Sequence, residues 1–395
     1  MTSFPAAGLT REFGPRHSRR HFLRAALGGG FVGASLLEQA VFRAAAARAQ
    51  SAGAASNLFE IERVAGGTYF ALARPAAILN CNAAIFVGSD GVMVVDTHSK
   101  PSAAAALVAQ IKRDITRKPV RWVVNTHFHY DHAQGTAAYM SAQPPPDVVG
   151  SRVTRSLLAE HGKRRVAAAV ESARKNIEDA RRKLSEARTA EERAYWSRLA
   201  AELTAFVKEM RDWEPVLPTV TFDGDFTIHD RDRTLRLIFR GRAHTASDVC
   251  VLCESTGVIA TGDLVAGFIP GMGDGYPLEW PSTRMQLGET GFRSMMPGHG
   301  PFQRDGTLAG QLRAYIEELN EAVDKARRTG LTLSQTEDRV TPATLRTLSA
   351  TGYGGMVAAA LERFTLHPPG WRAEQAIAAA VRANVAAVWN AIGSR

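Results

Sequence analysis

The sequence predicts an α/β protein built as a four-layer αββα sandwich, with an inserted helical hairpin and C-terminal helices. Three observations predict this architecture. Strand-rich segments form two halves, one beginning at Gly67 and the other running from Pro215 to Pro301. A charged, alanine-rich helical segment at 155–213 separates the halves. Each half places histidines and aspartates in the turns that follow its strands, so the candidate ligands of both halves are expected at one edge of the paired sheets.

The first half opens with β-rich segments joined by tight turns. "TYFALA", "AAIFVGS" and "GVMVVDT" are expected strands, and "SDG" is a hairpin turn signal. "SAAAALVAQIKRDI" has helical periodicity, and "PVRWVVNT" again reads as a strand. A strand, a helix and a second strand therefore lead directly into the cluster of histidines that begins at His127.

The segment 155–213 is predicted to be an antiparallel pair of helices. Apolar residues recur at spacings of four and three from Val166 to Ala187, and a second apolar seam runs from Trp196 to Met210. Between them Thr189 and Glu192 have the spacing of a capping box, which starts a new helix. The pattern leaves three interpretations open: an ordinary packed helix pair, a lid beside a substrate cleft, or an arm that contacts a second subunit in a homodimer.

The second half is expected to supply four more strands, in "TVTFDGDFTIHD", "TLRLIFRG", "DVCVLCES" and "GVIATGDLV". We predict a main domain over 58–305 and a C-terminal helical extension over 306–395 that packs on it. Cys250 and Cys253 lie three apart on one expected strand, so their side chains should face opposite ways. We therefore expect small core residues there rather than a redox or metal-binding pair, and Cys81 is the third cysteine.

Residues 1–49 have the three parts of an export leader. "SRRHFLR" resembles a twin-arginine signal, a moderately apolar stretch follows, and "ARA" ends at Ala49, where cleavage is expected. Glu38 and four glycines make the apolar part weak for a membrane span. We therefore predict passage through the twin-arginine export machinery, a periplasmic location and no stable membrane span after cleavage. The alternative is an ordinary amphipathic N-terminal helix.

The formal charge of +9 lies largely in that leader, which holds seven arginines and two acids. The rest of the chain is only mildly basic and has no basic stripe interleaved with aromatic residues. The composition therefore argues against a nucleic-acid partner.

The stretch "NTHFHYDHAQG" concentrates metal-capable side chains in one turn. His127 and His129 are two residues apart, so in an extended segment they face the same side. Asp131 and His132 follow where the chain can turn into a helix. Neutral imidazoles and carboxylates are ligands that suit Zn²⁺ and similar divalent ions, so the stretch predicts a metal site.

"THFHYDHAQG" resembles the signature of the metallo-β-lactamase superfamily. Four further motifs resemble that family's pattern and occur in its order between Gly67 and Pro301. These are "VMVVDT" with Asp96, "GRAHTASD" with His244, "IATGDLV" with Asp263 and "MMPGHGP" with His299.

The resemblance implies a dinuclear metal-dependent hydrolase with two divalent ions, zinc being the expected metal. Its motifs place His127, His129 and His244 at the first ion, and Asp131, His132 and His299 at the second, with Asp263 as the bridge. Asp96 would support the metal loop from beneath, and His98, close by, could assist it. The resemblance further implies attack by a metal-bridging hydroxide. Asp131 and Asp263 would be the catalytic carboxylates, with Asp131 orienting the nucleophile.

The departures from the family's branches narrow the expected substrate. The β-lactamases carry Cys or Ser where this chain has Asp263, and quorum-type lactonases carry a tyrosine where it has Ala266. A bridging aspartate resembles the glyoxalase II-like ligand set, although the C-terminal segment is a poor match to a glutathione site. We therefore expect cleavage of an ester, thioester, lactone or related bond in a small periplasmic substrate.

Four alternatives to this expectation stay open on the sequence. Two are other hydrolases, a β-lactam hydrolase and a sulfatase- or phosphodiesterase-type enzyme. A non-catalytic metal-binding module is disfavoured because all seven ligand positions are filled. Flavodiiron redox chemistry is disfavoured because it needs a glutamate where the chain has His129.

Overall fold

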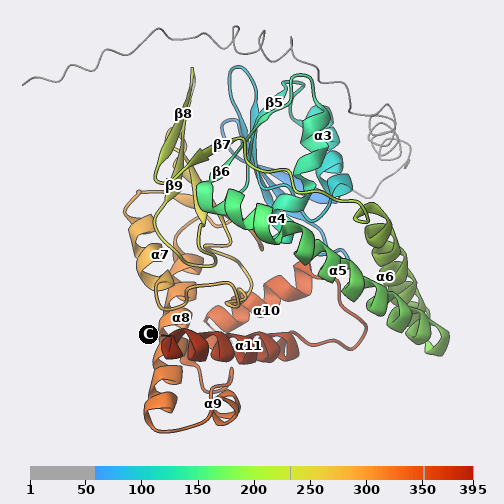
Figure 1. Cartoon of the computed structure of the whole chain (residues 1–395), viewed down its shortest axis with the longest axis vertical. Helices are drawn as coiled ribbons and strands as arrows, with labels where there is room; N and C mark the ends of the chain where they lie inside the picture. Colours follow the sequence, from blue (N-terminus) through green and yellow to red (C-terminus); the bar gives the residue numbers. More distant parts are fainter. Residues whose placement is uncertain (1–57, 232, 350–351, 395) are drawn as a thin grey trace, which may run out of the picture. The chain divides into compact units, whose positions relative to one another are not determined.

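The computed structural model describes residues 58–231, 233–349 and 352–394. The expected leader and its cleavage position at Ala49 lie outside the described residues. Within them the chain forms two β-sheets covered by helices, and Figure 1 shows the helices after β12 gathered on the side opposite to α3.

The first sheet has seven strands in sequence order, antiparallel from β1 to β4 and parallel from β4 to β7. Its strands are β1 (Phe59–Ala65), β2 (Thr68–Ala73), β3 (Ala83–Val87), β4 (Val92–Val95), β5 (Val120–Val124), β6 (Asp147–Ser151) and β7 (Val220–Phe222). Parallel neighbours need crossover connections. These are α3 (Pro101–Asp114), then α4 (Tyr130–Ala133) with η1 (Gln134–Ser141), then the pair α5 and α6.

The second sheet has five strands in the order β12-β11-β10-β9-β8. They are β8 (Phe226–Asp230), β9 (Arg233–Phe239), β10 (Val249–Cys253), β11 (Val258–Gly262) and β12 (Ser294–Pro297). Strand β10 shows how the layers form, because its side chains alternate. Val251 and Cys253 pack between the two sheets, whereas Cys250 and Leu252 face the C-terminal helices. The prediction that the side chains of Cys250 and Cys253 face opposite sides of the strand is therefore confirmed, and both are buried free thiols.

The outer layers complete the four-layer sandwich. Leu107 and Ile111 of α3 pack on the outer face of the first sheet. Leu312 and Ile316 of α8 (Thr307–Arg328) pack on the outer face of the second, together with α7 (Trp280–Gly288). The predicted fold class, an αββα sandwich with a helical hairpin and C-terminal helices, is confirmed.

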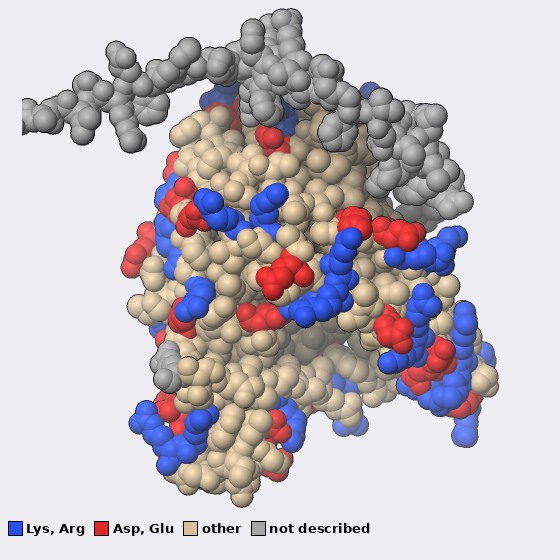
Figure 2. All heavy atoms as spheres, viewed as in Figure 1, with Lys and Arg blue, Asp and Glu red and all other residues tan. Residues whose placement is uncertain are grey.

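The helical pair consists of α5 (Arg152–Glu186) and α6 (Ala190–Glu209), which lie side by side. Thr189 and Glu192 form the capping box that the sequence predicts at the start of α6. The two seams meet through buried residues such as Ile177 and Phe206, and the same cluster includes Ile78 of the loop after β2. Figure 2 shows Lys, Arg, Asp and Glu side chains crowded at the far end of the pair, as expected for a solvated tip.

After α8 the chain continues through α9 (Leu333–Arg339), η2 (Arg346–Leu348), α10 (Tyr353–Phe364) and α11 (Ala373–Gly393). Helix α11 is long and apolar enough to cross a membrane by length and composition. However, Ile377, Val381 and Val385 bury one of its faces in the same core as α8. That contact is typical of a core helix of the folded domain.

Candidate metal centre

The loop after β5 carries four of the predicted ligands. His127 is buried three residues beyond the end of β5, and His129 is the N-cap residue of α4. Asp131 and His132 are the second and third residues of that helix, and both are buried. The imidazole rings of His127 and His129 lie 4.7 Å apart, so the extended stretch does turn both toward one volume.

The other three predicted ligands come from loops of the second sheet. His244 follows β9, Asp263 follows β11 and His299 follows β12. Gly298 allows the loop that carries His299 to lie close to Asp263, because a Cβ atom at position 298 would collide with Oδ1 of Asp263. The first glycine of "PGHGP" is therefore required by the close packing of two ligand-bearing loops.

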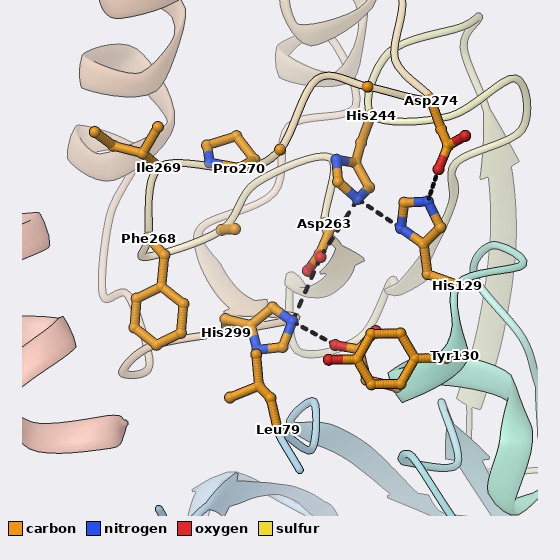
Figure 3. A pocket seen from close by; sticks show the side chains of 14 residues that line it. Leu79, His129, Tyr130, His244, Asp263, Phe268, Ile269, Pro270, Asp274 and His299 are labelled. Carbon is orange, nitrogen blue, oxygen red and sulfur yellow. Dashed lines mark hydrogen bonds and ion pairs between the residues drawn. The ribbon is translucent and has the colours of Figure 1, made fainter. Parts of the chain in front are cut away.

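Asp263 lies between two groups of side chains. Its Oδ2 atom is 3.5 Å from Nε2 of His244, 3.4 Å from Nε2 of His132 and 3.4 Å from Nε2 of His299. On one side, Nε2 of His244 lies 3.0 Å from Nδ1 of His129. On the other, Nε2 of His299 lies 3.0 Å from Oδ2 of Asp131. Figure 3 shows the contacts of Asp263 with His244 and His299, and those of His244 with His129 and of His299 with Asp131.

Three sets of these atoms are close enough to hold a metal ion, each within 4.8 Å of one another. They are His127, His129 and His244; Asp131, His132 and His299; and His127, His132 and Asp263. Nε2 of His127, Nε2 of His132 and Oδ1 of Asp263 are buried without a hydrogen-bond partner. Because a buried polar atom without a partner costs about 1–3 kcal/mol, this arrangement fits bound divalent ions.

Outer partners fix which nitrogen of His132 and of His127 faces the site. Nδ1–H of His132 donates to Oδ2 of Asp96 at 2.7 Å, and Nδ1 of His127 lies 3.0 Å from Oγ1 of Thr126. Asp96 also accepts from the backbone N–H and the hydroxyl of Thr126. Asp96 thus supports the loop, and it does so from a left-handed backbone conformation, φ 67°. Carboxylate–imidazole pairs of this kind orient metal ligands.

His98 is fully buried and lies one step further from the site. Its Nδ1 atom is 2.9 Å from the carbonyl oxygen of Cys81, and its ring stacks on Phe59 with centroids 4.2 Å apart. Burial lowers its pKa to about 3, so it is neutral. Its contacts hold the loop around Cys81.

The imidazole pKa values differ between the two groups of side chains on either side of Asp263. Burial, followed by the neighbouring His129, lowers the pKa of His244 to about 3. Burial likewise lowers the pKa of His127 well below its usual range. For His299 burial opposes protonation, but Asp263 and Asp131 outweigh it and raise the pKa to about 9. Despite burial, His299 and His132 hold the pKa of Asp263 well below that of a free carboxyl.

The sequence pattern did not single out Asp274 as a site residue. Its Oδ2 atom lies 3.1 Å from Nε2 of His129, and its Oδ1 atom lies 2.6 Å from the guanidinium of Arg165 on α5. That guanidinium also lies over the ring of Phe128, 4.6 Å from its centroid. Asp274 stands in the glycine-rich stretch "PGMGDGYP", and a lone aspartate between glycines was the one available signal.

The site opens into a cavity of about 300 Å³. Its lining combines candidate ligands, among them His129, Asp131, His244, Asp263 and His299, with apolar residues of the loops at 79 and 266–270. A concave apolar pocket that contains a few convergent polar groups is the usual form of a small-molecule site.

A sandwich of two sheets with a His/Asp cluster in the loops at one edge defines a class of metal-binding hydrolase folds. The chain belongs to the metallo-β-lactamase superfamily, whose family model matches residues 77–323. Members of this superfamily are mostly metal-dependent hydrolases.

Solved structures with a similar chain trace include a metallo-β-lactamase from Pontibacter korlensis. It is 20% identical, with a TM-score of 0.47 over 64% of this chain and 97% of that chain. Another is a metallo-β-lactamase from Erythrobacter litoralis, crystallised with β-mercaptoethanol in its active site. It is 16% identical, with a TM-score of 0.47 over 66% of this chain and 97% of that chain.

Proposed function

We propose that the protein is a dinuclear zinc hydrolase that cleaves an ester, thioester, lactone or related bond in a small substrate. The observation that carries the proposal is the position of Asp263, whose Oδ2 atom lies within 3.5 Å of His132, His244 and His299. Imidazole and carboxylate donors in this proportion suit zinc. Two ions held there would activate a shared water and polarise the bond to be cleaved.

The chain's own residues would each have a defined part in this reaction. His127, His129 and His244 would hold one ion, Asp131, His132 and His299 the other, and Asp263 would join them. Asp131 lines the cavity with its Oδ2 atom 3.0 Å from Nε2 of His299, where it can orient the attacking water. Asp96 and Asp274 would keep His132 and His129 turned toward the metals.

The direct test is a substrate panel on purified protein of measured metal content. The panel covers esters, thioesters, lactones, β-lactams, phosphodiesters and alkyl sulfates. We expect two divalent ions per chain and turnover of a carboxylic ester-type bond that chelation removes. Asp263→Ala should lose most metal and reduce turnover by several orders of magnitude, whereas His229→Ala, at an exposed position on β8, should match wild type. Full activity of Asp263→Ala would end the proposal.

We further propose that the enzyme works in the periplasm after twin-arginine export and removal of the leader near Ala49. The support is the order of "SRRHFLR", an apolar stretch and "ARA" in the first 49 residues. The test replaces Arg19 and Arg20 with lysine and compares the cell fractions. Undiminished periplasmic protein in that variant would exclude the twin-arginine route.

A further inference from the structure

The proposed reaction leaves one half of the cavity without a role. Beside the candidate ligands, the cavity is lined by an apolar wall: Leu79, Tyr130, Ala266, Phe268, Ile269 and Pro270. Figure 3 shows Leu79 and Phe268 next to His299. A substrate whose reacting bond lies at the metals must therefore place part of its remaining structure against this wall.

No lysine or arginine is among the described residues that line the cavity. Its one carboxylate outside the candidate ligands, Asp274, is already paired with Arg165 and His129. A carboxylate or phosphate group that lies against the apolar wall, away from the candidate metal ligands, would lose water there and meet no lysine or arginine side chain. Burying such a charge without a partner is strongly unfavourable.

The wall is held in place from several directions. The ring of Phe268 stacks on His299 with centroids 5.5 Å apart, and its carbonyl accepts from the Tyr353 hydroxyl of α10 at 2.8 Å. The carbonyl of Pro270 accepts from Asn384 of α11 at 3.0 Å. On the other side, Ile78 packs against the α5–α6 pair and precedes Leu79. The apolar surface is therefore preorganised rather than formed on binding.

The cavity has an apolar wall and no lysine or arginine among its described lining residues. We therefore propose that the substrate carries an uncharged, apolar alkyl or aryl group beside the bond that is cleaved. Substrates with an anionic group in that place are selected against. The inference rests on the proposed hydrolase function and specifies its substrate class.

The test uses two esters of the same carbon-chain length that differ in their end group, which is neutral in one and charged in the other. 4-Nitrophenyl pentanoate ends in a methyl group, and 4-nitrophenyl hydrogen glutarate ends in a carboxylate at the equivalent place. With the uncatalysed rates subtracted, we expect kcat/KM for the pentanoate to exceed that for the glutarate by about 10-fold or more, the usual discrimination of such a pocket. A preference for the glutarate would overturn the inference and leave the hydrolase proposal intact.

Three variants test whether the apolar wall determines the preference for the uncharged ester. Leu79→Lys adds a cation to the wall and should shift the ratio toward the glutarate by about 10-fold, while the matched neutral Leu79→Gln should only weaken pentanoate turnover. Tyr130→Lys repeats the test at a position that is 39% exposed and so tolerates a charge. All three variants are compared with wild type at equal metal content and unfolding temperature. Unchanged ratios in correctly folded lysine variants would also overturn the inference.

If the metal-loaded protein cleaves no member of the full panel, the hydrolase proposal itself fails and the substrate inference falls with it. That result is distinguishable from a reversed charge preference, because the latter requires measurable turnover.

Discussion

Individual residues around the metal centre divide into those that face the metals and those that turn the ligands toward them. Asp274 belongs to the second kind and joins His129 to Arg165 of α5. The hydrogen bond from His129 lowers the pKa of Asp274 well below the usual range of a carboxyl group, and the Arg165 guanidinium adds to this effect. Together they outweigh burial, which acts in the opposite direction. An ionised Asp274 therefore fixes the orientation of His129 and connects it to the inserted helices.

Replacing Asp274 with asparagine should weaken metal binding by about 10–100-fold, the usual effect of losing an outer carboxylate partner. Competition with a chromophoric chelator measures the affinity without any substrate. Asp225→Asn is the matched control, since Asp225 is also paired with arginines, Arg240 and Arg236, but it directly precedes β8 of the second sheet. Equal metal affinities of the Asp274→Asn protein and wild type would show that this carboxylate does not position the ligand.

His299 gives the metal affinity a pH dependence. Its raised pKa of about 9 in the metal-free protein means that a proton occupies the imidazole below that pH. A metal must displace this proton, so apparent affinity should rise with pH and level off near pH 9. Isothermal titration at pH 6, 7, 8 and 9 measures this slope, together with the protons released in buffers of different ionisation enthalpy. A flat profile with no proton release would contradict the prediction.

At the scale of elements, the C-terminal helices reach into the cavity wall. Asn384 of α11 is buried and bonds to both sides of a turn: it accepts from the N–H of Met272 and donates to the carbonyl of Pro270. It also lies 3.2 Å from the hydroxyl of Tyr315 on α8. One side chain thus holds the wall loop against two helices.

Asn384→Ala should leave Met272 N–H and the Pro270 carbonyl unpaired, at a cost of about 1–3 kcal/mol for each buried group. We expect a lower unfolding temperature and a raised KM, with kcat and metal content close to wild type because no candidate ligand is touched. Asn390→Ala, at an exposed position on the same helix, is the control. A loss of kcat at unchanged KM would show that the loop acts in chemistry rather than in binding.

The α5–α6 pair is anchored to the same region. Glu202 accepts from the backbone N–H of Ala77 at 2.7 Å, and Nε1 of Trp213 donates to the carbonyl of Gln134 at 2.8 Å. Lys183 lies over the ring of Trp196, 4.6 Å from its centroid. Trp196 and Trp213 thus have partners within the chain. The pair borders the wall through Ile78.

At the scale of the whole molecule, the two sheets and the ligand-bearing turns could be predicted because their signals are local. Alternating strands, the glycine-flanked turns and the spacing of His127 to His132 all occur within short stretches. Asp274, Arg165 and Asn384 could not be predicted, because each acts through a partner more than a hundred positions away. Only the packing of α5 and α11 brings these side chains to the site, and no periodicity encodes that packing.

The metals should also stabilise the whole fold. The ligands on 127–132 follow a strand of the first sheet, and those at 244, 263 and 299 follow strands of the second, so bound ions would join the two sheets. Because the unfolded chain does not hold these groups together, an ion present at 100 times its dissociation constant stabilises the native state by about 2.7 kcal/mol. For a domain of this size the gain corresponds to an unfolding temperature raised by at least a few degrees.

Calorimetry of the chelated protein, before and after zinc is restored, measures this change. Asp263→Ala should abolish most of the zinc-dependent increase, and His229→Ala should preserve it. The comparison separates ions that bridge the sheets from ions bound at the surface, because surface ions would raise the unfolding temperature of both variants equally.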